Sequence, residues 1–259
     1  MLAKNKIKKS IIFEEIKKIG VITLNRQEVL NAWNKEMRLE ICEIFKKIKK
    51  EKKIKAVILT GSGKKAFCAG QDLNELKDFK TSQIDSWIDE FKDVYTAIRS
   101  AEIPTISCIN GAAVGSGFQL SLLTDIRIAH KFAKIGQVEI NSGIVSVTGP
   151  WIIKKVLNLS TSIQLSLTGK LVSGKEALNM GVIHHLTNKN NVMKLSLKIA
   201  KELSEKPENA MRITKKRFWE VFRLGMDEAF QSAKKYHRIS FKSGEPQKTT
   251  KNFLKKSFF

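Results

Sequence analysis

Two glycine-punctuated stretches decide the expected fold of this chain: AFCAGQDL at residues 66–73 and NGAAVGSGFQ at residues 110–119. Each follows a short apolar run and leads into a segment with the pattern of a helix. Two turns of this kind can direct backbone N–H groups at one shared point, which builds an oxyanion-binding site without charged side chains. The two stretches therefore indicate carbonyl chemistry.

The segments around these stretches alternate between strand and helix patterns. Short apolar runs predict two strands within 11–25, with Gly20 at the turn between them, and further strands at 56–60, 105–110 and 125–129. Amphipathic spacing predicts helices at 35–50, 84–100 and 118–123. This alternation favours an α/β layer architecture.

The strand pattern is lost from about residue 195 onward. Lys206-Pro207 marks a break, and two more helices are predicted at 210–225 and 226–241. We therefore divide the chain into a core at residues 1–195 and a C-terminal helical region at residues 196–259 that serves packing or oligomerisation.

Length and composition indicate a globular protein. The 259 residues are near the upper limit for one hydrophobic core, and 42% are apolar and 28% charged. No stretch approaches the roughly 18 apolar residues of a membrane span. Residues 1–10 are basic but lack the apolar segment of a signal peptide. We expect a cytoplasmic protein without a membrane partner.

The formal net charge of +22 would suit an anionic ligand, a membrane surface or nucleic acid. The lysines are spread along the chain and seldom alternate with aromatic residues, as they do in proteins that bind single strands. A diffuse cationic surface is therefore favoured over a nucleic-acid site.

The three cysteines, Cys42, Cys68 and Cys108, are too scattered for a disulfide framework or a metal cluster. Cys68 lies in a glycine-flanked turn and is either a nucleophile or a small packed residue. The packed residue is favoured, because no histidine is near it in the sequence. The four histidines lack metal-ligand spacing, and no phosphate loop or dinucleotide fingerprint is present. We expect no metal.

Six segments, in register, resemble the crotonase (enoyl-CoA hydratase/isomerase) superfamily. NRQEVLNA at residues 25–32 is similar to the signature N-R-P-x-x-x-N-A, with Gln27 in place of the proline. The other segments that resemble family motifs are 66–73 (A-F-x-A-G-x-D-L), 110–120 (N-G-x-A-x-G-G-G-x-E-L), 125–129, 136–140 (G-Q-P-E) and 167–183 (L-T-G, then A-x-x-x-G-L-V).

The resemblance implies a spiral of β-β-α repeats that assembles as a homotrimer or a dimer of trimers. It implies that the C-terminal helices pack against the core or a neighbouring subunit. It also implies an acyl-CoA thioester substrate, so that CoA is part of the substrate and no separate cofactor is expected.

The resemblance also assigns binding positions. The backbone N–H groups of Gln71 and Ser116 would hold the thioester oxygen. Asp72 would cap the following helix or fix the turn in preference to doing chemistry. The residues implied to bind the acyl-CoA are Arg26, Ala69, Gly70, Asp72, Leu73, Asn74, Gly115, Lys255 and Lys256.

A thioester enolate also needs a proton carrier, and the resemblance assigns that role to Glu139. It places Gln119 where hydratases of the family have a second glutamate. An amide can orient water or a ligand but cannot take up a proton at ordinary pH, whereas one carboxylate is sufficient to move a double bond. Isomerisation is slightly favoured, with hydration of 2-enoyl-CoA as the alternative.

Two further classes of function stay open. A basic crotonase homologue that binds RNA would lose affinity steeply as salt rises. A non-catalytic CoA-thioester binder would keep its ligand after Glu139→Ala. Ser146–Pro150 departs from the glycine-rich stretch of many relatives, and Ser116 replaces a glycine, so the acyl specificity is open.

Overall fold

A six-stranded sheet forms one layer of the computed structural model, which describes residues 9–256 and the side chains up to residue 252. Its order is β1-β2-β3-β5-β7-β10, and β1 and β2 are antiparallel while the other neighbours are parallel. The strands β3 and β5 are buried throughout, as expected of parallel strands covered on both faces. The bounds are β1 (Ile11–Ile16), β2 (Ile19–Leu24), β3 (Ala56–Gly61), β5 (Thr105–Ile109), β7 (Ile126–His130) and β10 (His185–Thr187).

A second sheet of four strands has the order β4-β6-β8-β9. Its strands are β4 (Ala66–Cys68), β6 (Ala112–Val114), β8 (Lys134–Gly136) and β9 (Val172–Ser173). Three times in succession, a strand of the large sheet is followed by a strand of the small one: β3 then β4, β5 then β6, and β7 then β8. This repeated turn confirms the predicted α/β spiral.

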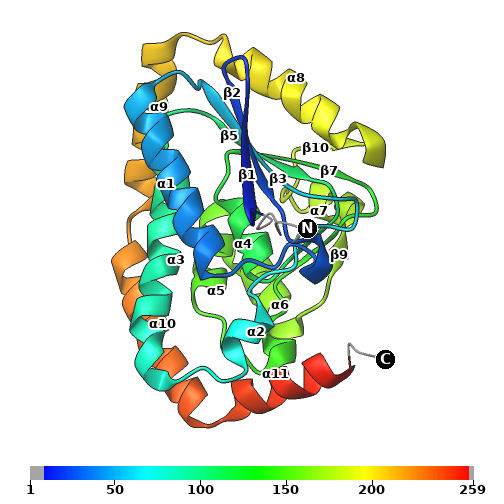
Figure 1. The fold of residues 1–259 in the computed structure, drawn as a ribbon, viewed down its shortest axis with the longest axis vertical. Helices are drawn as coiled ribbons and strands as arrows, with labels where there is room; N and C mark the ends of the chain where they lie inside the picture. The colour runs from blue at the N-terminus through cyan, green and yellow to red at the C-terminus, as the bar shows by residue number, and fades with distance from the viewer. Residues whose placement is uncertain (1–8, 257–259) are drawn as a thin grey trace, which may run out of the picture.

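Helices cover both faces of the large sheet (Figure 1). On one face lie α1 (Lys35–Glu51) and α3 (Ile84–Arg99), with α10 (Met226–Lys242) packed against α3. On the other face α8 (Val192–Ser204) packs against β2, β3, β5 and β7. The remaining helices are α2 (Leu73–Leu76), α4 (Ser116–Leu122), α5 (Thr148–Val156), α6 (Leu159–Thr168), α7 (Gly174–Asn179), α9 (Glu208–Phe222), α11 (Glu245–Lys256) and the short 3-10 turns η1 (Gln27–Val29), η2 (Thr81–Gln83), η3 (Glu139–Ser142) and η4 (Lys189–Asn191).

The helix predicted at 35–50 shows why the long elements could be read from the sequence. The Asn34 side chain accepts a hydrogen bond from the Met37 N–H and caps the first turn. Met37, Ile41 and Ile44 recur on one face, and all are buried. Hydrophobic spacing and a cap therefore agree, and the helix forms as predicted.

Two local predictions were wrong. The turn between the first two strands is at Lys17 and Lys18, and Gly20 lies inside β2. A Cβ at Gly20 would stand 2.9 Å from the Phe13 ring, so this glycine makes room for cross-strand packing and not for a turn. The helix predicted at 118–123 begins two residues earlier, at Ser116.

The C-terminal helices pack on their own chain. The division drawn after residue 195 falls within α8, whose Val192 and Ala200 are buried against the large sheet. At the end of the described chain, α11 contacts α2 and η3. A Cβ at Gly143 would lie 3.0 Å from Thr249 Oγ1, and Gln247 Nε2 donates a 3.4 Å hydrogen bond to the Phe79 carbonyl. Among the described residues, no helix is long and apolar enough to span a membrane.

Candidate active site

Three turns meet at one edge of the small sheet. The strands β4, β6 and β8 are neighbouring and parallel, so their carboxyl ends lie at the same edge. Gln71 follows β4, Ser116 follows β6 and Glu139 follows β8. A Cβ at Gly70 would stand 3.5 Å from Ser116 N, and one at Gly115 would stand 3.3 Å from Glu139 Oε1. The topology thus brings together residues from three distant segments.

The two glycine turns leave a pair of backbone N–H groups without backbone partners. Gly70 and Gly115 have φ values of +99° and +56°, which a glycine adopts without strain. Trp33 donates its N–H to the Gly70 carbonyl and accepts from the Asp72 N–H, so the intervening Gln71 N–H points the other way. Within residues 9–256, no backbone carbonyl accepts from the N–H of Gln71 or Ser116.

Glu139 is the first residue of η3, and its carboxyl group is poised to exchange a proton. Burial raises the pKa of this carboxyl to about 7, and the hydrogen bonds that it accepts oppose the rise only in part. Its Oε1 accepts a 2.9 Å hydrogen bond from Gln119 Nε2. Its Oε2 is buried without a hydrogen-bond partner among the described residues. One carboxyl oxygen is therefore held in place while the other is free to accept a proton.

Hydrogen bonds at both the oxygen and the nitrogen fix the orientation of the Gln119 amide. Its Oε1 accepts hydrogen bonds from the Tyr95 hydroxyl and from Thr148 Oγ1, the second at 3.1 Å. Two donors occupy both lone pairs of the oxygen and turn the NH₂ group toward Glu139. Burial raises the pKa of Tyr95, so its hydroxyl remains a donor. Tyr95 could not be singled out from the sequence, because an aromatic residue on the apolar face of the 84–100 helix is typical of a core residue.

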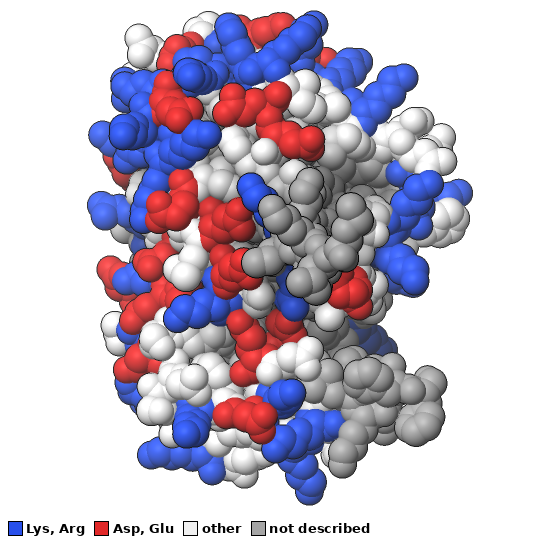
Figure 2. Space-filling view, viewed as in Figure 1, with Lys and Arg blue, Asp and Glu red and all other residues white. Residues whose placement is uncertain are grey.

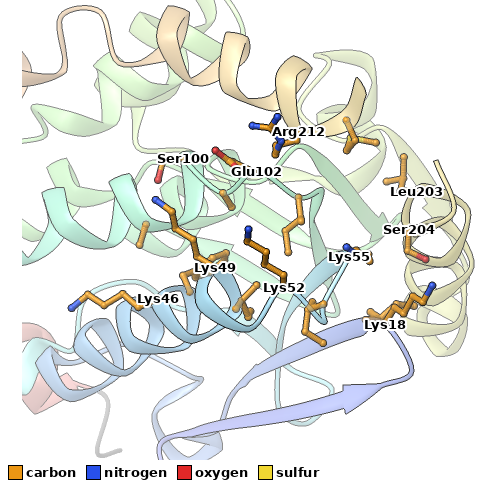
Figure 3. Close-up of a pocket in the computed structure, with 18 of the residues that line it drawn as sticks. Lys18, Lys46, Lys49, Lys52, Lys55, Ser100, Glu102, Leu203, Ser204 and Arg212 are labelled. Atoms are coloured by element: carbon orange, nitrogen blue, oxygen red, sulfur yellow. The ribbon is translucent and has the colours of Figure 1, made fainter. Parts of the chain in front are cut away.

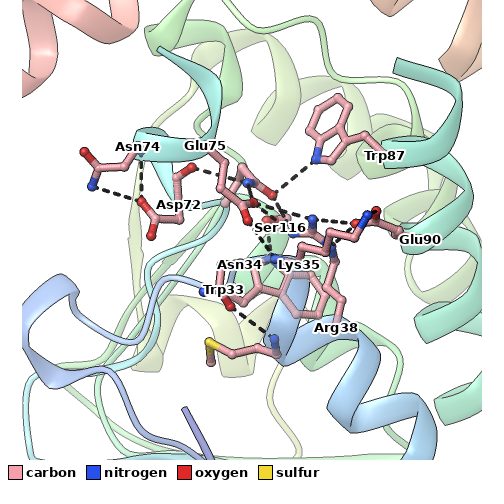
Figure 4. A network of polar contacts seen from close by, with 12 residues as sticks. Trp33, Asn34, Lys35, Arg38, Asp72, Asn74, Glu75, Trp87, Glu90 and Ser116 are labelled. Carbon is pink, nitrogen blue, oxygen red and sulfur yellow. Dashed lines mark hydrogen bonds and ion pairs between the residues drawn. The ribbon is translucent and has the colours of Figure 1, made fainter. Parts of the chain in front are cut away.

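A buried polar network holds the side chains of the two turns (Figure 4). Trp33 Nε1 donates a 2.8 Å hydrogen bond to Ser116 Oγ. Arg38, only 1% exposed, donates to Gln71 Oε1 at 3.0 Å and forms a 2.8 Å ion pair with Glu90. Because their side chains are anchored in the protein, the backbone of the turns is held in one orientation.

Glu75 completes this network by accepting a 2.6 Å hydrogen bond from Gln71 Nε2. The sequence did not single out Trp33, Arg38, Glu75 or Glu90. Arg38 lies among the charged residues of an amphipathic helix pattern, and its burial becomes visible only when α3 packs beside α1.

The other predicted substrate-binding residues surround the first turn. Arg26 Nη1 forms a 2.7 Å ion pair with Asp72, which also caps α2 by accepting from the Asn74 N–H at 2.9 Å. Ala69 donates its N–H to the Leu30 carbonyl, and Leu73 begins α2. The side chains of Lys255 and Lys256 lie outside the described residues. Contact of all these residues with CoA stays a prediction.

Cys68 lies beside the turn but is fully buried, and burial raises the pKa of its thiol to about 12. A thiol that stays protonated is a poor nucleophile, so Cys68 is a packed residue here. No group of three or more His, Cys, Asp or Glu side chains able to hold a metal ion occurs in the described part of the chain.

A family model described as enoyl-CoA hydratase/isomerase matches residues 14–259. The chain belongs to the enoyl-CoA hydratase/isomerase family. This is a family of enzymes, and the glycine turns and Glu139 all lie within the matched region.

Individual members of the enoyl-CoA hydratase/isomerase family align with most of the chain. The short-chain-enoyl-CoA hydratase of Clostridium acetobutylicum is 30% identical over 207 residues, which cover 80% of this chain and 79% of that protein. The crotonyl-CoA hydratase of Syntrophomonas wolfei is 27% identical and covers 95% of each chain. The crystal structure of an enoyl-CoA hydratase from Bacillus halodurans has a TM-score of 0.86 and 24% identity, covering 94% of this chain and all of that chain, and supports the fold.

Proposed function

We propose that this protein moves the double bond of an enoyl-CoA thioester, with Glu139 carrying the proton. One observation carries the proposal: Glu139 Oε2 has no hydrogen-bond partner in the described part of the chain, and the pKa of this carboxyl group is about 7. The carboxyl group lies against Gly115, next to the free backbone N–H of Ser116. An acid/base group works best when its pKa is near the operating pH. The group that exchanges the proton and the donor that stabilises the enolate would then face the same substrate.

The reaction balances with a single carboxylate. Glu139 takes a proton from C2 of a 3-enoyl thioester, and the electron pair moves onto the thioester oxygen, which gives a dienolate. The N–H groups of Gln71 and Ser116 donate to that oxygen, and each donor contributes about 3–4 kcal/mol by analogy with measured oxyanion holes. The protonated Glu139 returns the proton to C4, which leaves the double bond between C2 and C3.

The bonding of Gln119 supports isomerisation over hydration. Hydration needs a group that accepts a proton from water, or at least positions it. Both lone pairs of Gln119 Oε1 are occupied by the Tyr95 and Thr148 hydroxyls, and one N–H is directed at Glu139. Gln119 therefore has no acceptor left for a water molecule, and its remaining N–H can orient water but cannot take up a proton. Its role in this proposal is to orient Glu139.

Hydration of a 2-enoyl-CoA is the second candidate, and it is favoured by the relatives. The proteins of Clostridium acetobutylicum and Syntrophomonas wolfei are both named as hydratases. In this case Glu139 alone would serve both as the base for water and as the acid for C2.

For the CoA portion we propose contacts along the first turn. Residues 69–74 and Gly115 border the two N–H groups, so they lie where the thioester and pantetheine would pass. Arg26 stands at the same turn, paired with Asp72, and keeps donors that could meet a phosphate. Lys255 and Lys256 are proposed to reach the 3′-phosphate.

Isotope labelling separates the two reactions. The purified protein is incubated in D₂O with a panel of 2-enoyl- and 3-enoyl-CoA thioesters, and the products are followed by mass spectrometry. We expect interconversion of the double-bond isomers without gain of water, and deuterium incorporation to the extent that the proton on Glu139 exchanges with solvent before a proton reaches C4. A gain of one water that is lost in Glu139→Gln would establish hydration instead, and the absence of any turnover would contradict both candidates.

We also propose that the chain assembles as a trimer or a dimer of trimers, with α6 in an interface. Leu159, Ile163 and Leu167 follow one another at four-residue spacing and are 54%, 49% and 67% exposed. This spacing places them on one face of the helix. An exposed apolar stripe of this kind marks a contact surface.

The double variant Ile163→Glu/Leu167→Glu tests this interface. We expect light scattering to give about three or six times the 29.3 kDa chain mass for the parent protein and a single chain mass for the variant, because burying two carboxylates is unfavourable. Gln164→Glu/Thr168→Glu adds the same charge at exposed positions about 100° around the helix and should keep the parent mass. If both variants keep it, α6 is not in the interface.

A further inference from the structure

A groove of about 1690 Å³ lies on a part of the molecule remote from the Glu139 turn. Its walls are the C-terminal half of α1, the end of α3, the end of α8, the start of α9 and the turn between β1 and β2 (Figure 3). None of the residues assigned to catalysis lines it. The groove is therefore a feature that the proposed reaction does not use.

The lining of the groove combines apolar and cationic side chains. The apolar surface comes from Ile16 and Leu39, which are 45% and 48% exposed, and from the half-buried Ile103, Leu203 and Met211. Figure 3 shows Lys49 on α1 and Lys52, the residue that follows α1, facing Arg212 on α9, with Lys18 near the other end. In the space-filling view, many Lys and Arg side chains stand at the end of the molecule where α8 and α9 lie, with Asp and Glu side chains among them (Figure 2).

The cations of the groove divide into paired and unpaired ones. Lys46 and Lys55 form 2.7 Å ion pairs with Glu43 and Glu208. In contrast, Lys18, Lys49, Lys52 and Arg212 have no carboxylate within ion-pair distance among the described residues. Glu208 also attracts Lys52 and Arg212, but the lining as a whole holds nine Lys and Arg side chains against six Asp and Glu side chains. This excess of positive charge beside apolar side chains is complementary to a ligand that has an apolar face flanked by carboxylates.

The size of the groove matches a segment of helix. A helix about 10 Å across that rises 1.5 Å per residue fills 1690 Å³ with roughly 14 residues. Two helices of this protein, α1 and α9, form opposite walls, which is the arrangement in which an amphipathic helix lies in a groove.

The lining is less suited to nucleic acid. Phe45, the aromatic residue among the lining side chains, is buried at 5% exposure and offers no stacking face. An acidic amphipathic helix satisfies the apolar surface and the unpaired cations together.

We propose that this groove is a docking site for an acidic amphipathic helix of a partner protein. The apolar face of that helix lies on the surface formed by Ile103, Leu203 and Met211, and its carboxylates pair with Lys49, Lys52 and Arg212. No residue of the Glu139 turn lines the groove, and Glu90 is the lining residue that also belongs to the polar network of the active site, through Arg38.

A synthetic peptide tests the proposal. The probe has 14 residues, leucines along one helical face, glutamates beside them and a fluorescein label, and its binding is followed by anisotropy. We expect saturable binding of order 10 μM, typical of a short helix in a groove. A peptide with lysine in place of glutamate, and one with the leucines scrambled, should each bind at least tenfold more weakly.

Charge-reversal variants test whether the peptide binds in the groove. Lys49→Glu/Arg212→Glu should weaken binding of the acidic peptide at least tenfold, with thermal unfolding measured to show that the fold is intact. Lys170→Glu/Lys175→Glu makes the same change of charge at exposed positions outside the groove and should bind as the parent does. If the control variant loses as much affinity as the groove variant, attraction is diffuse and the docking site is refuted.

Two other outcomes would overturn the proposal. One is the absence of saturable binding below ~1 mM peptide, the weak end of specific association. The other is displacement of the peptide by a single-stranded RNA oligonucleotide whose own binding is lost in Lys49→Glu/Arg212→Glu, which would assign the groove to nucleic acid.

Discussion

Replacing Glu139 by glutamine is expected to lower kcat by about 10²–10⁴-fold, the usual contribution of a general acid/base. The amide has nearly the same shape and still accepts the Gln119 hydrogen bond, so substrate binding should change little. The loss should therefore appear in kcat and not in KM, measured with the enoyl-CoA that the parent converts fastest. A variant that keeps more than a tenth of the parent kcat would show that Glu139 does not carry the proton.

The same substitution should raise stability in a pH-dependent way. The pKa of Glu139 is raised from 4.5 to about 7 in the folded protein, so the folded state holds its proton more tightly than the unfolded state. No stability is lost below pH 4.5, and the cost of ionising the buried carboxyl grows as the pH rises toward 7. Glu139→Gln should thus gain up to about 3 kcal/mol at pH 8 and nothing at pH 4.

Denaturant unfolding at pH 4 and pH 8 measures that difference, and Glu202→Gln on the exposed face of α8 is the matched control. The parent enzyme should also show kcat/KM falling on the acid side of about pH 7, because the base must be ionised before it can take a proton. An equal gain in stability at both pH values would mean that burial does not disfavour the charged form.

Replacing Gln119 by glutamate is expected to create or enhance water addition. The new carboxylate would accept from Tyr95 and Thr148 as the amide does, and its second oxygen would lie close to Glu139 Oε1. Two carboxyl groups at that distance share one proton near neutral pH, so one is a base while the other is an acid. We expect hydration of a 2-enoyl-CoA to rise about 10–10²-fold, measured as a mass gain of one water.

The double variant Gln119→Glu/Glu139→Gln separates the two positions. It restores a single carboxylate, now on α4, and should show neither the hydration of Gln119→Glu nor the isomerisation of the parent. If Gln119→Glu hydrates the substrate no faster than the parent does, the amide at position 119 is not the cause of slow hydration in the parent. A parent protein that already hydrates at the rate of Gln119→Glu would favour the second candidate function.

The long elements and the two glycine turns could be predicted because their signals are local. The helix at 84–100 and the strand at 56–60 appear with nearly the predicted bounds, since hydrophobic spacing alone specifies which face is buried. The parallel order of β4, β6 and β8 is not local: the sequence pattern predicted none of these three strands, and the family resemblance implied only a spiral of β-β-α repeats. That order is what brings Gln71, Ser116 and Glu139 to one edge.

The supporting residues could not be predicted because their partners are far away in the sequence. Trp33 bonds to Ser116 across 83 positions, and Tyr95 bonds to Gln119 across 24. Each is an ordinary core aromatic residue in its own segment. The helices α5 and α6 were also missed, because their apolar residues are divided between the core and an exposed stripe, which blurs the helical pattern.

The contact of α11 with η3 has a consequence for biosynthesis. Chains are made from the N-terminus at about 5–20 residues per second, so the 106 positions from Glu139 to Glu245 take roughly 5–20 s to translate. During that interval the strand ends can meet on the ribosome, but η3 still lacks the helix that packs on it. We therefore expect catalytic turnover only after α11 has been translated and has packed on η3. A translation product that ends before α11 would be inactive although its fold is nearly complete.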